Sequence, residues 1–272
     1  MKGFFPVALE AAATFAKQQL SAPLTIVATS DEESSMAGSR YLLECGKPKA
    51  DYAIIGEPTA MQPIFAHKGI SMMTIQLEGA SGHSSDPSLG ANALDAMHRV
   101  MGELIAMREE LAAANQNNAF AVNVPTMNLG CMRAGDNPNR ICGHAALQID
   151  LRLLPGMDSE AIHEALERRI AAVVANTGVS LQLHKAYPPI PPFQSDPNGD
   201  LLGALSGLSG NQPGTVAFGT EAHFMQTLGM ETVVWGPGSI DQAHQPNEYL
   251  DKAQLAPATD TLRRVIQKFC LV

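Results

Sequence analysis

The sequence predicts an α/β fold, a parallel-sheet domain with a smaller α+β domain inserted into it. Two continuous apolar runs, residues 24–28 and 52–55, are typical of buried parallel strands between helices. Beyond Lys68 the strands instead alternate apolar and polar residues, which indicates an antiparallel sheet with one wet face. After the segment 187–193, where four of seven residues are proline, the α/β rhythm returns.

These changes define the expected domains. They are a first catalytic-domain part over 1–67, an inserted domain over 68–184 and a second catalytic-domain part over 185–272.

The first part delivers acidic residues at two successive strand ends. A helix over 3–20 precedes the strand 24–28, which runs into Asp31-Glu32-Glu33. The strand 52–55 runs into Glu57 in the same way. Open α/β sheets bind their ligands at the carboxyl ends of strands, so these glutamates are candidate functional residues.

The inserted domain and the second part also show clear periodicities. The inserted domain is expected to contain a strand over 71–78, a helix over 94–111, a strand over 145–152, a helix capped by Asp158 and a strand over 179–183. The second part is expected to contain a helix over 201–208, a strand over 216–218, a helix over 221–228, a strand over 232–235 and a last helix opened by a capping box at 251–254.

Composition excludes several classes of protein. The 272 residues are 45% hydrophobic and carry a net charge of −9 without a Lys/Arg cluster, so we expect no nucleic-acid partner. No apolar run approaches the roughly 18 residues of a membrane-spanning helix, so we expect no membrane association. The four cysteines are scattered without metal-type spacing, which favours free thiols and a cytoplasmic location.

The polar residues at the strand ends suit a metal. Glu33, Glu57 and His244, which follows the strand at 232–235, offer oxygen and imidazole donors without sulfur. Such donors suit zinc, manganese or cobalt in a hydrolytic site. The alternative is a solvated loop whose acidic residues favour the start of a helix, with His244 an ordinary surface residue.

Five separated motifs, in order along the whole chain, resemble those of the M20 metallopeptidases. The motifs are Asp31-Glu32-Glu33, Gly56-Glu57-Pro58-Thr59, Ser81-Gly82-His83-Ser84-Ser85, Asn139-Arg140-Ile141, and Gly236-Pro237-Gly238 through His244-Gln245-Pro246.

The resemblance implies a role for each matching residue. Glu32 is similar to the family's general base, which takes a proton from water and later gives one to the leaving amine. Glu33 and His244 match ligands of one zinc ion, and Glu57 matches a ligand of a second; Co2+ or Mn2+ is an alternative metal. His83 resembles a histidine that reaches the partner subunit's active site and stabilises the oxyanion; its alternative is a turn residue.

Four further residues match substrate-binding positions: Asn139, Arg152, Gly219 and Thr220. They fall where relatives hold the carboxylate and backbone of the substrate. For Arg152, an exposed strand position with Asp150 as a salt-bridge neighbour is an equal alternative. The nearby Glu221 and His223 could contact substrate, but polar residues at a helix N-terminus are the preferred interpretation.

The implied activity is that of a zinc-dependent amide hydrolase acting on a small N-acyl amino acid. Removal of acetate from N2-acetyl-L-ornithine in arginine biosynthesis is the expected reaction. Desuccinylation of succinyl-diaminopimelate, deacylation of another N-acyl amino acid, and a non-catalytic dimeric remnant are the alternatives. The resemblance also implies a homodimer formed through the inserted domain.

The chain departs from the family pattern at its start. Relatives carry a His-x-Asp motif and then a metal-bridging aspartate directly before Met-Lys-Gly-Phe, whereas this sequence begins Met1-Lys2-Gly3-Phe4. Without these ligands neither zinc site reaches the three protein ligands of a catalytic zinc. We therefore expect the 272-residue chain to be inactive or barely active by itself, with an exposed sheet edge.

Overall fold

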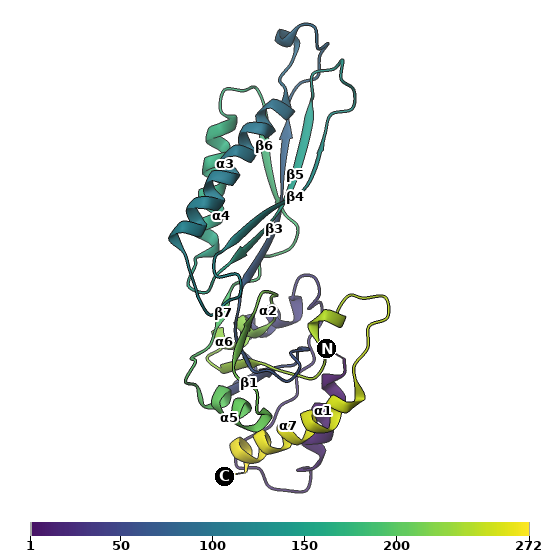
Figure 1. Cartoon of the computed structure of the whole chain (residues 1–272), viewed down its shortest axis with the longest axis vertical. Coiled ribbons are helices and arrows are strands. Elements are labelled where there is room, and N and C mark those ends of the chain that lie inside the picture. The colour runs from purple at the N-terminus through teal and green to yellow at the C-terminus, as the bar shows by residue number, and fades with distance from the viewer. Residues whose placement is uncertain (1, 272) are drawn as a thin grey trace. The chain divides into compact units, whose positions relative to one another are not determined.

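The computed structural model describes residues 2–271, which form two compact units (Figure 1). The α/β unit contains the described residues up to His67, Phe193–Val216 and those from Thr220 onward. The inserted unit contains Lys68–Pro192 and Ala217–Gly219. The proline-rich segment belongs to the inserted unit because Ile70 and Ile190 exchange two backbone hydrogen bonds of 2.8 and 2.9 Å.

The α/β unit is built on a five-stranded mixed sheet. Its strands are β1 (Tyr52–Ile55), β2 (Ile64–His67), β7 (Phe193–Gln194), β8 (Gly214–Val216) and β9 (Glu231–Val234). The order is β1-β9-β2-β7, and β8 pairs with β2. The pairs β1–β9 and β2–β8 are parallel, as the sequence predicted, but β2 runs antiparallel to β9 and β7. The connection from β1 to β2 is too short for the crossover of a dozen or more residues that a parallel return requires.

Helices pack around this sheet. They are α1 (Phe4–Ala13), α2 (Ala37–Glu44), α5 (Asp200–Ser209), α6 (Ala222–Thr227) and α7 (Leu255–Cys270). Trp235 and Val233 are fully buried in a core to which α1, α5 and α7 contribute, for example through Val7, Leu205 and Leu262. The core thus anchors the carboxyl end of β9, where the loop that leads to the candidate ligand His244 begins.

The predicted capping box near the C-terminus forms only in part. Asp251 caps the 3₁₀ helix η3 (Lys252–Gln254) by accepting from the Ala253 amide at 2.9 Å. The Gln254 side chain does not reach back to the cap; it accepts from the Gly238 amide at 2.7 Å. This bond fastens the loop after β9 to the start of α7.

The prediction of a buried strand over 24–28 is wrong. The segment has no regular secondary structure, and Leu24, Ile26 and Val27 are 38–40% exposed. A strand needs a neighbour that satisfies its backbone N–H and C=O groups. Within residues 2–271 β1 pairs only with β9, so this segment has no ladder to join. The first helix is also shorter than predicted, since α1 ends at Ala13.

The inserted unit is a four-stranded antiparallel sheet with two helices, α3 (Ala93–Ala114) and α4 (Ser159–Val174), on one face (Figure 1). Its strands, in the order β4-β5-β3-β6, are β4 (Thr126–Ala134), β5 (His144–Leu153), β3 (Gly69–Glu78) and β6 (Ser180–Lys185). The Asp158 carboxylate caps α4, as predicted.

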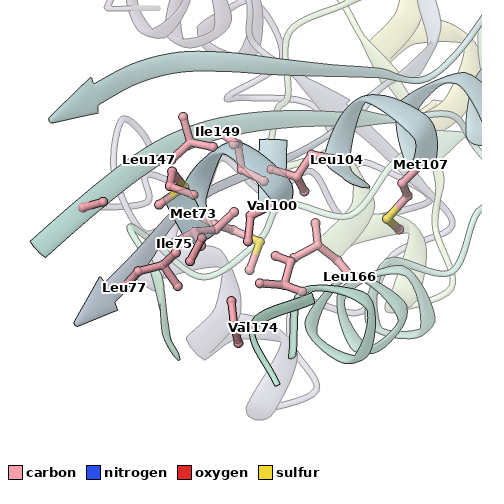
Figure 2. Close-up of a cluster of buried hydrophobic side chains, with 14 of the residues drawn as sticks. Met73, Ile75, Leu77, Val100, Leu104, Met107, Leu147, Ile149, Leu166 and Val174 are labelled. Atoms are coloured by element: carbon pink, nitrogen blue, oxygen red, sulfur yellow. The ribbon is translucent and has the colours of Figure 1, made fainter. Parts of the chain in front are cut away.

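The core of the inserted unit follows the predicted alternation. Met73, Ile75 and Leu77 of β3 are buried, and Figure 2 shows them pointing toward side chains of α3 and α4, such as Val100 and Leu166. The strand β4 was not predicted, because it is an edge strand with most of its residues exposed and a register shift at Gly130.

None of the helices within residues 2–271 is long and apolar enough to cross a membrane. The cysteines Cys45, Cys131, Cys142 and Cys270 are all free.

Candidate functional site

The loops that follow β1 and β9 are held together by backbone hydrogen bonds. The Met61 amide donates to Gly236 O at 2.8 Å and the Ala60 amide to Gly238 O at 2.6 Å. A Cβ atom at Gly236 would lie 2.6 Å from the carbonyl oxygen of Glu57, so only glycine allows this approach. The loop carrying Glu57 and the loop leading to His244 therefore form one layer at the end of the sheet.

The glutamate loop, residues 29–39, carries Glu32 and Glu33 and folds tightly onto the start of α2. Asp31 and Met36 adopt left-handed backbone conformations, with φ of 59° and 52°. The Met36 amide donates to Asp31 O at 2.7 Å, which closes the turn that contains Glu32. A Cβ atom at Gly38 would lie 2.6 Å from the Ser30 backbone nitrogen, so this contact also requires glycine.

Glu221 joins the site, although the sequence favoured a plain helix-terminal role for it. It occupies the N-cap position of α6, but its side chain does not cap the helix. Its carboxylate instead accepts from Thr29 Oγ1 at 2.9 Å and from Ser39 Oγ at 2.6 Å. The available signal was positional, because Glu221 follows β8 much as Glu57 follows β1.

The glutamates lie close enough for their charges to interact. Burial raises the pKa of Glu57 to about 8, and the neighbouring Glu32 adds to the shift. Burial likewise raises the pKa of Glu32 to about 7, with further contributions from Glu33 and Glu221. Desolvation and like charge both disfavour ionised carboxylates. A carboxyl group with a pKa near 7 can accept and return a proton at neutral pH, which suits general acid–base catalysis.

The metal donors are present in kind but incomplete in number. Glu33 Oε2 and His244 Nε2 lie 3.6 Å apart, and both side chains are exposed. No three His, Cys, Asp or Glu side chains within residues 2–271 gather closely enough to hold a metal. A catalytic zinc requires three protein ligands. The described residues therefore do not complete a zinc site, and the roles of Glu33, Glu57 and His244 as ligands stay a prediction.

The inserted unit brings His83 and Asn139 into neighbouring loops. The Ser84 amide donates to Asn139 O at 3.1 Å, and His83 forms a backbone bridge with Arg140. The Ser85 amide donates to His83 Nδ1 at 3.2 Å, so the proton of the neutral ring lies on Nε2. The His83 side chain is exposed and can present this N–H as a donor.

Arg152 lies at the other end of the same unit. Its guanidinium pairs with the Asp150 carboxylate at 2.9–3.0 Å, which is the alternative that the sequence left open. Arg152 is paired in register with Ile70, whereas His83 follows the far end of β3. Eight residues of strand span roughly 27 Å, so within one chain Arg152 and His83 do not contact the same small molecule.

The two other predicted substrate residues are tightly packed. Thr220 is fully buried, its amide donates to His67 Nε2 at 3.4 Å, and its Oγ1 accepts from the Ala222 amide. A Cβ atom at Gly219 would lie 2.9 Å from the Ile70 side chain. Both positions are constrained by packing, and their contact with substrate stays a prediction.

Sequence comparison relates the chain to one enzyme family and to two acetylornithine deacetylases. The model of peptidase family M20/M25/M40 matches residues 1–268. Acetylornithine deacetylase from Pectobacterium atrosepticum is 42% identical over 270 residues, which are 99% of this chain and 70% of that protein. Acetylornithine deacetylase from Salmonella arizonae is 43% identical over 270 residues, with the same coverage.

Solved structures show the same fold. The M20 family metallo-carboxypeptidase Sso-CP2 from Sulfolobus solfataricus superimposes with a TM-score of 0.74 at 18% identity, over 98% of this chain and 75% of that one. Human carnosine dipeptidase 1 gives a TM-score of 0.67 at 14% identity, over 96% and 70% of the two chains. At these identities the likeness concerns the fold alone.

Proposed function

The chain belongs to peptidase family M20/M25/M40, and on that premise we propose that it hydrolyses the acetyl amide of N2-acetyl-L-ornithine. The observation that carries this proposal is its 42–43% identity, over 99% of its length, to two acetylornithine deacetylases. The reaction places the enzyme in arginine biosynthesis. The free cysteines are compatible with the cytoplasmic location that we propose.

Glu32 is the general base in this proposal. Its half-buried carboxylate accepts a proton from the attacking water and returns one to the amine of ornithine as the amide bond breaks. General acid–base catalysis of this kind contributes on the order of 10²–10⁴ in rate. A pKa of about 7 suits both steps, because Glu32 is then neither fully ionised nor fully protonated at neutral pH.

We propose Glu33, Glu57 and His244 as donors to Zn2+, with Co2+ or Mn2+ as substitutes. Their chemistry supports this role, and the short distance between Glu33 and His244 supports a shared ion. Because no third donor joins this pair within residues 2–271, we expect the 272-residue chain to bind Zn2+ weakly and to hydrolyse substrate slowly.

The inserted unit supplies further groups in this proposal. We assign His83 to oxyanion stabilisation in a partner subunit's site, since its exposed Nε2–H is a free-standing donor in the neutral tautomer. Asn139, in the adjoining loop, would accompany it. Arg152, Gly219 and Thr220 would bind the substrate's carboxylate and backbone. This arrangement requires a homodimer.

Hydrolysis of a substrate panel tests the proposal. The rates with N2-acetyl-L-ornithine, succinyl-diaminopimelate and N-acetyl-methionine are compared alongside the zinc content, for this chain and for a form extended upstream. The variant Glu32→Gln is compared with Glu44→Gln, an exposed glutamate on α2. We expect acetylornithine to be preferred and Glu32→Gln to lose at least about 100-fold in kcat.

Two outcomes would contradict the proposal. Preference for the succinylated substrate would assign the chain to the sister activity. A zinc-loaded protein that hydrolyses none of the panel would favour a non-catalytic protein.

A further inference from the structure

We infer that Glu221 is a positioning residue, whose carboxylate fixes the glutamate loop by accepting hydrogen bonds from both of its ends. Thr29 is the first residue of this loop and Ser39 the last. Glu32 and Glu33 lie between them. The catalytic consequence of this inference rests on the proposed function, in which Glu32 moves the proton.

The geometry shows one carboxylate bridging two segments. Oε2 accepts from Thr29 Oγ1 at 2.9 Å, and Oε1 accepts from Ser39 Oγ at 2.6 Å. Ser39 is only 1% exposed. If the Glu221 carboxylate were removed, the Ser39 hydroxyl would lose a hydrogen bond that water does not readily replace. Each carboxylate oxygen therefore holds a different end of the loop.

The Glu221 carboxylate has no competing structural task among the described residues. None of the ion pairs within residues 2–271 includes it. It also makes no capping bond to α6, although it occupies the N-cap position of that helix. Its hydrogen bonds to the glutamate loop thus account for its orientation.

The glutamate loop needs such a restraint. The turn around Glu32 and Glu33 is held by few hydrogen bonds within the loop, the shortest of which is the 2.7 Å bond from the Met36 amide to Asp31 O. Both of these residues have left-handed backbone conformations. The helices α2 and α6 have a second contact besides the Ser39–Glu221 hydrogen bond, because the Arg40 guanidinium of α2 lies 5.2 Å from the centre of the Phe224 ring of α6. The helix α6 therefore serves as the support against which the loop is set.

Positioning matters because proton transfer requires Glu32 within hydrogen-bond reach of the attacking water. A misplacement of about 1 Å in a catalytic group can reduce the rate about 100-fold. Glu221 itself contacts no reacting atom in this scheme. It acts through the placement of Glu32.

Amide hydrogen exchange of the full chain, measured by NMR, tests the inference without requiring activity. The variants are Glu221→Ala, Glu221→Gln and Ser39→Ala, with Glu44→Gln as the matched control. We expect Glu221→Ala to speed exchange of the Met36 amide by about tenfold or more, since a hydrogen bond to a charged acceptor is lost at each end. Glutamine keeps one oxygen acceptor for one hydroxyl, and its NH2 group can donate to the other, because a serine or threonine hydroxyl also accepts. Glu221→Gln should therefore restore most of the protection.

Steady-state kinetics with N2-acetyl-L-ornithine, on the zinc-loaded form extended upstream, provide the second readout. We expect Glu221→Ala to lower kcat with little change in KM, and Glu221→Gln to recover most of the rate. The double variant Ser39→Ala with Glu221→Ala should exchange no faster than Glu221→Ala, because the two residues share one bond.

The inference is overturned if Glu221→Ala leaves exchange in the glutamate loop within twofold of the parent protein. It is also overturned if exchange rises equally in α7, which would indicate general destabilisation, or if Glu221→Gln behaves like Glu221→Ala. Faster exchange confined to the loop, together with a zinc-loaded, upstream-extended form that hydrolyses no acylated amino acid, would support the positioning role and refute the proposed function.

Discussion

Replacing the buried Glu57 with glutamine should stabilise the α/β unit when no metal is bound. Glu57 is 7% exposed, and its pKa in the folded protein is about 8, against an ordinary value of 4.5. Between these two values the folded protein keeps a proton that the unfolded chain has released. Folding stability therefore falls as the pH rises through this window.

The magnitude follows from the two pKa values. At pH 7 the unfolded carboxylate has been ionised over about 2.5 pH units, and at about 1.4 kcal/mol per unit the parent protein loses on the order of 3 kcal/mol. The loss vanishes near pH 4 and approaches about 5 kcal/mol above pH 8. Glutamine has nearly the same shape as glutamate and remains neutral, so Glu57→Gln should remove this pH dependence.

Urea unfolding followed by tryptophan fluorescence measures the stability of the α/β unit, which contains Glu57. The protein has one tryptophan, Trp235, and it is fully buried in the core of the α/β unit. Titrations are run with a chelator at pH 5, 7 and 8, with the exposed Glu44→Gln as the control. A Glu57→Gln variant no more stable than the parent at pH 8, or a gain that is the same at pH 5, would refute the reasoning.

Three further predictions concern other parts of the chain. Burial lowers the pKa of His163, whose Nε2 lies 2.8 Å from Ser71 Oγ. The inserted unit should therefore lose stability as the pH falls below about 6.5, because the unfolded chain then binds a proton that the folded protein does not. His163→Leu should abolish this pH dependence in urea unfolding followed by circular dichroism. Gly38→Ala should destabilise the α/β unit by about 1–3 kcal/mol in the fluorescence assay, because the new methyl group meets backbone atoms. Glu33→Gln and His244→Ala should each weaken Zn2+ binding by about tenfold or more in calorimetric titrations.

Each of these three has an outcome that would contradict it. Equal pH dependence in the parent protein and in His163→Leu would exclude that histidine as the titrating group. Unchanged stability of Gly38→Ala would mean that the glutamate loop moves aside without cost. Zinc affinity that responds to only one of Glu33→Gln and His244→Ala would show that the pair does not share an ion.

Glu32, Glu33, Glu57 and Glu221 form a cluster of carboxyl groups whose charges interact. Like charges and burial make such a cluster unfavourable in a metal-free fold. A fold keeps such an unfavourable cluster of carboxyl groups when the surrounding structure fixes it and the function requires it.

The sequence by itself determined the local elements and the family. Met73, Ile75 and Leu77 alternate with polar residues, and a strand with one buried face is the direct physical result of that period. Glu57 was a candidate functional residue for a similarly local reason, since it follows β1 and strand ends are where such sheets bind ligands. Glu32 and Glu33 were reached through the strand predicted over 24–28, which does not form, and the family motif is what identifies them.

Tertiary structure decided what depends on neighbours distant in sequence. The apolar run at 24–28 is as hydrophobic as a strand, but no segment within residues 2–271 pairs with it, and pairing is not encoded in the run itself. The role of Glu221 likewise depends on Thr29 and Ser39, more than 180 positions away along the chain. Hydrogen bonds of this kind exist only after the helices and strands have packed, because local spacing specifies an element and only packing specifies its partner.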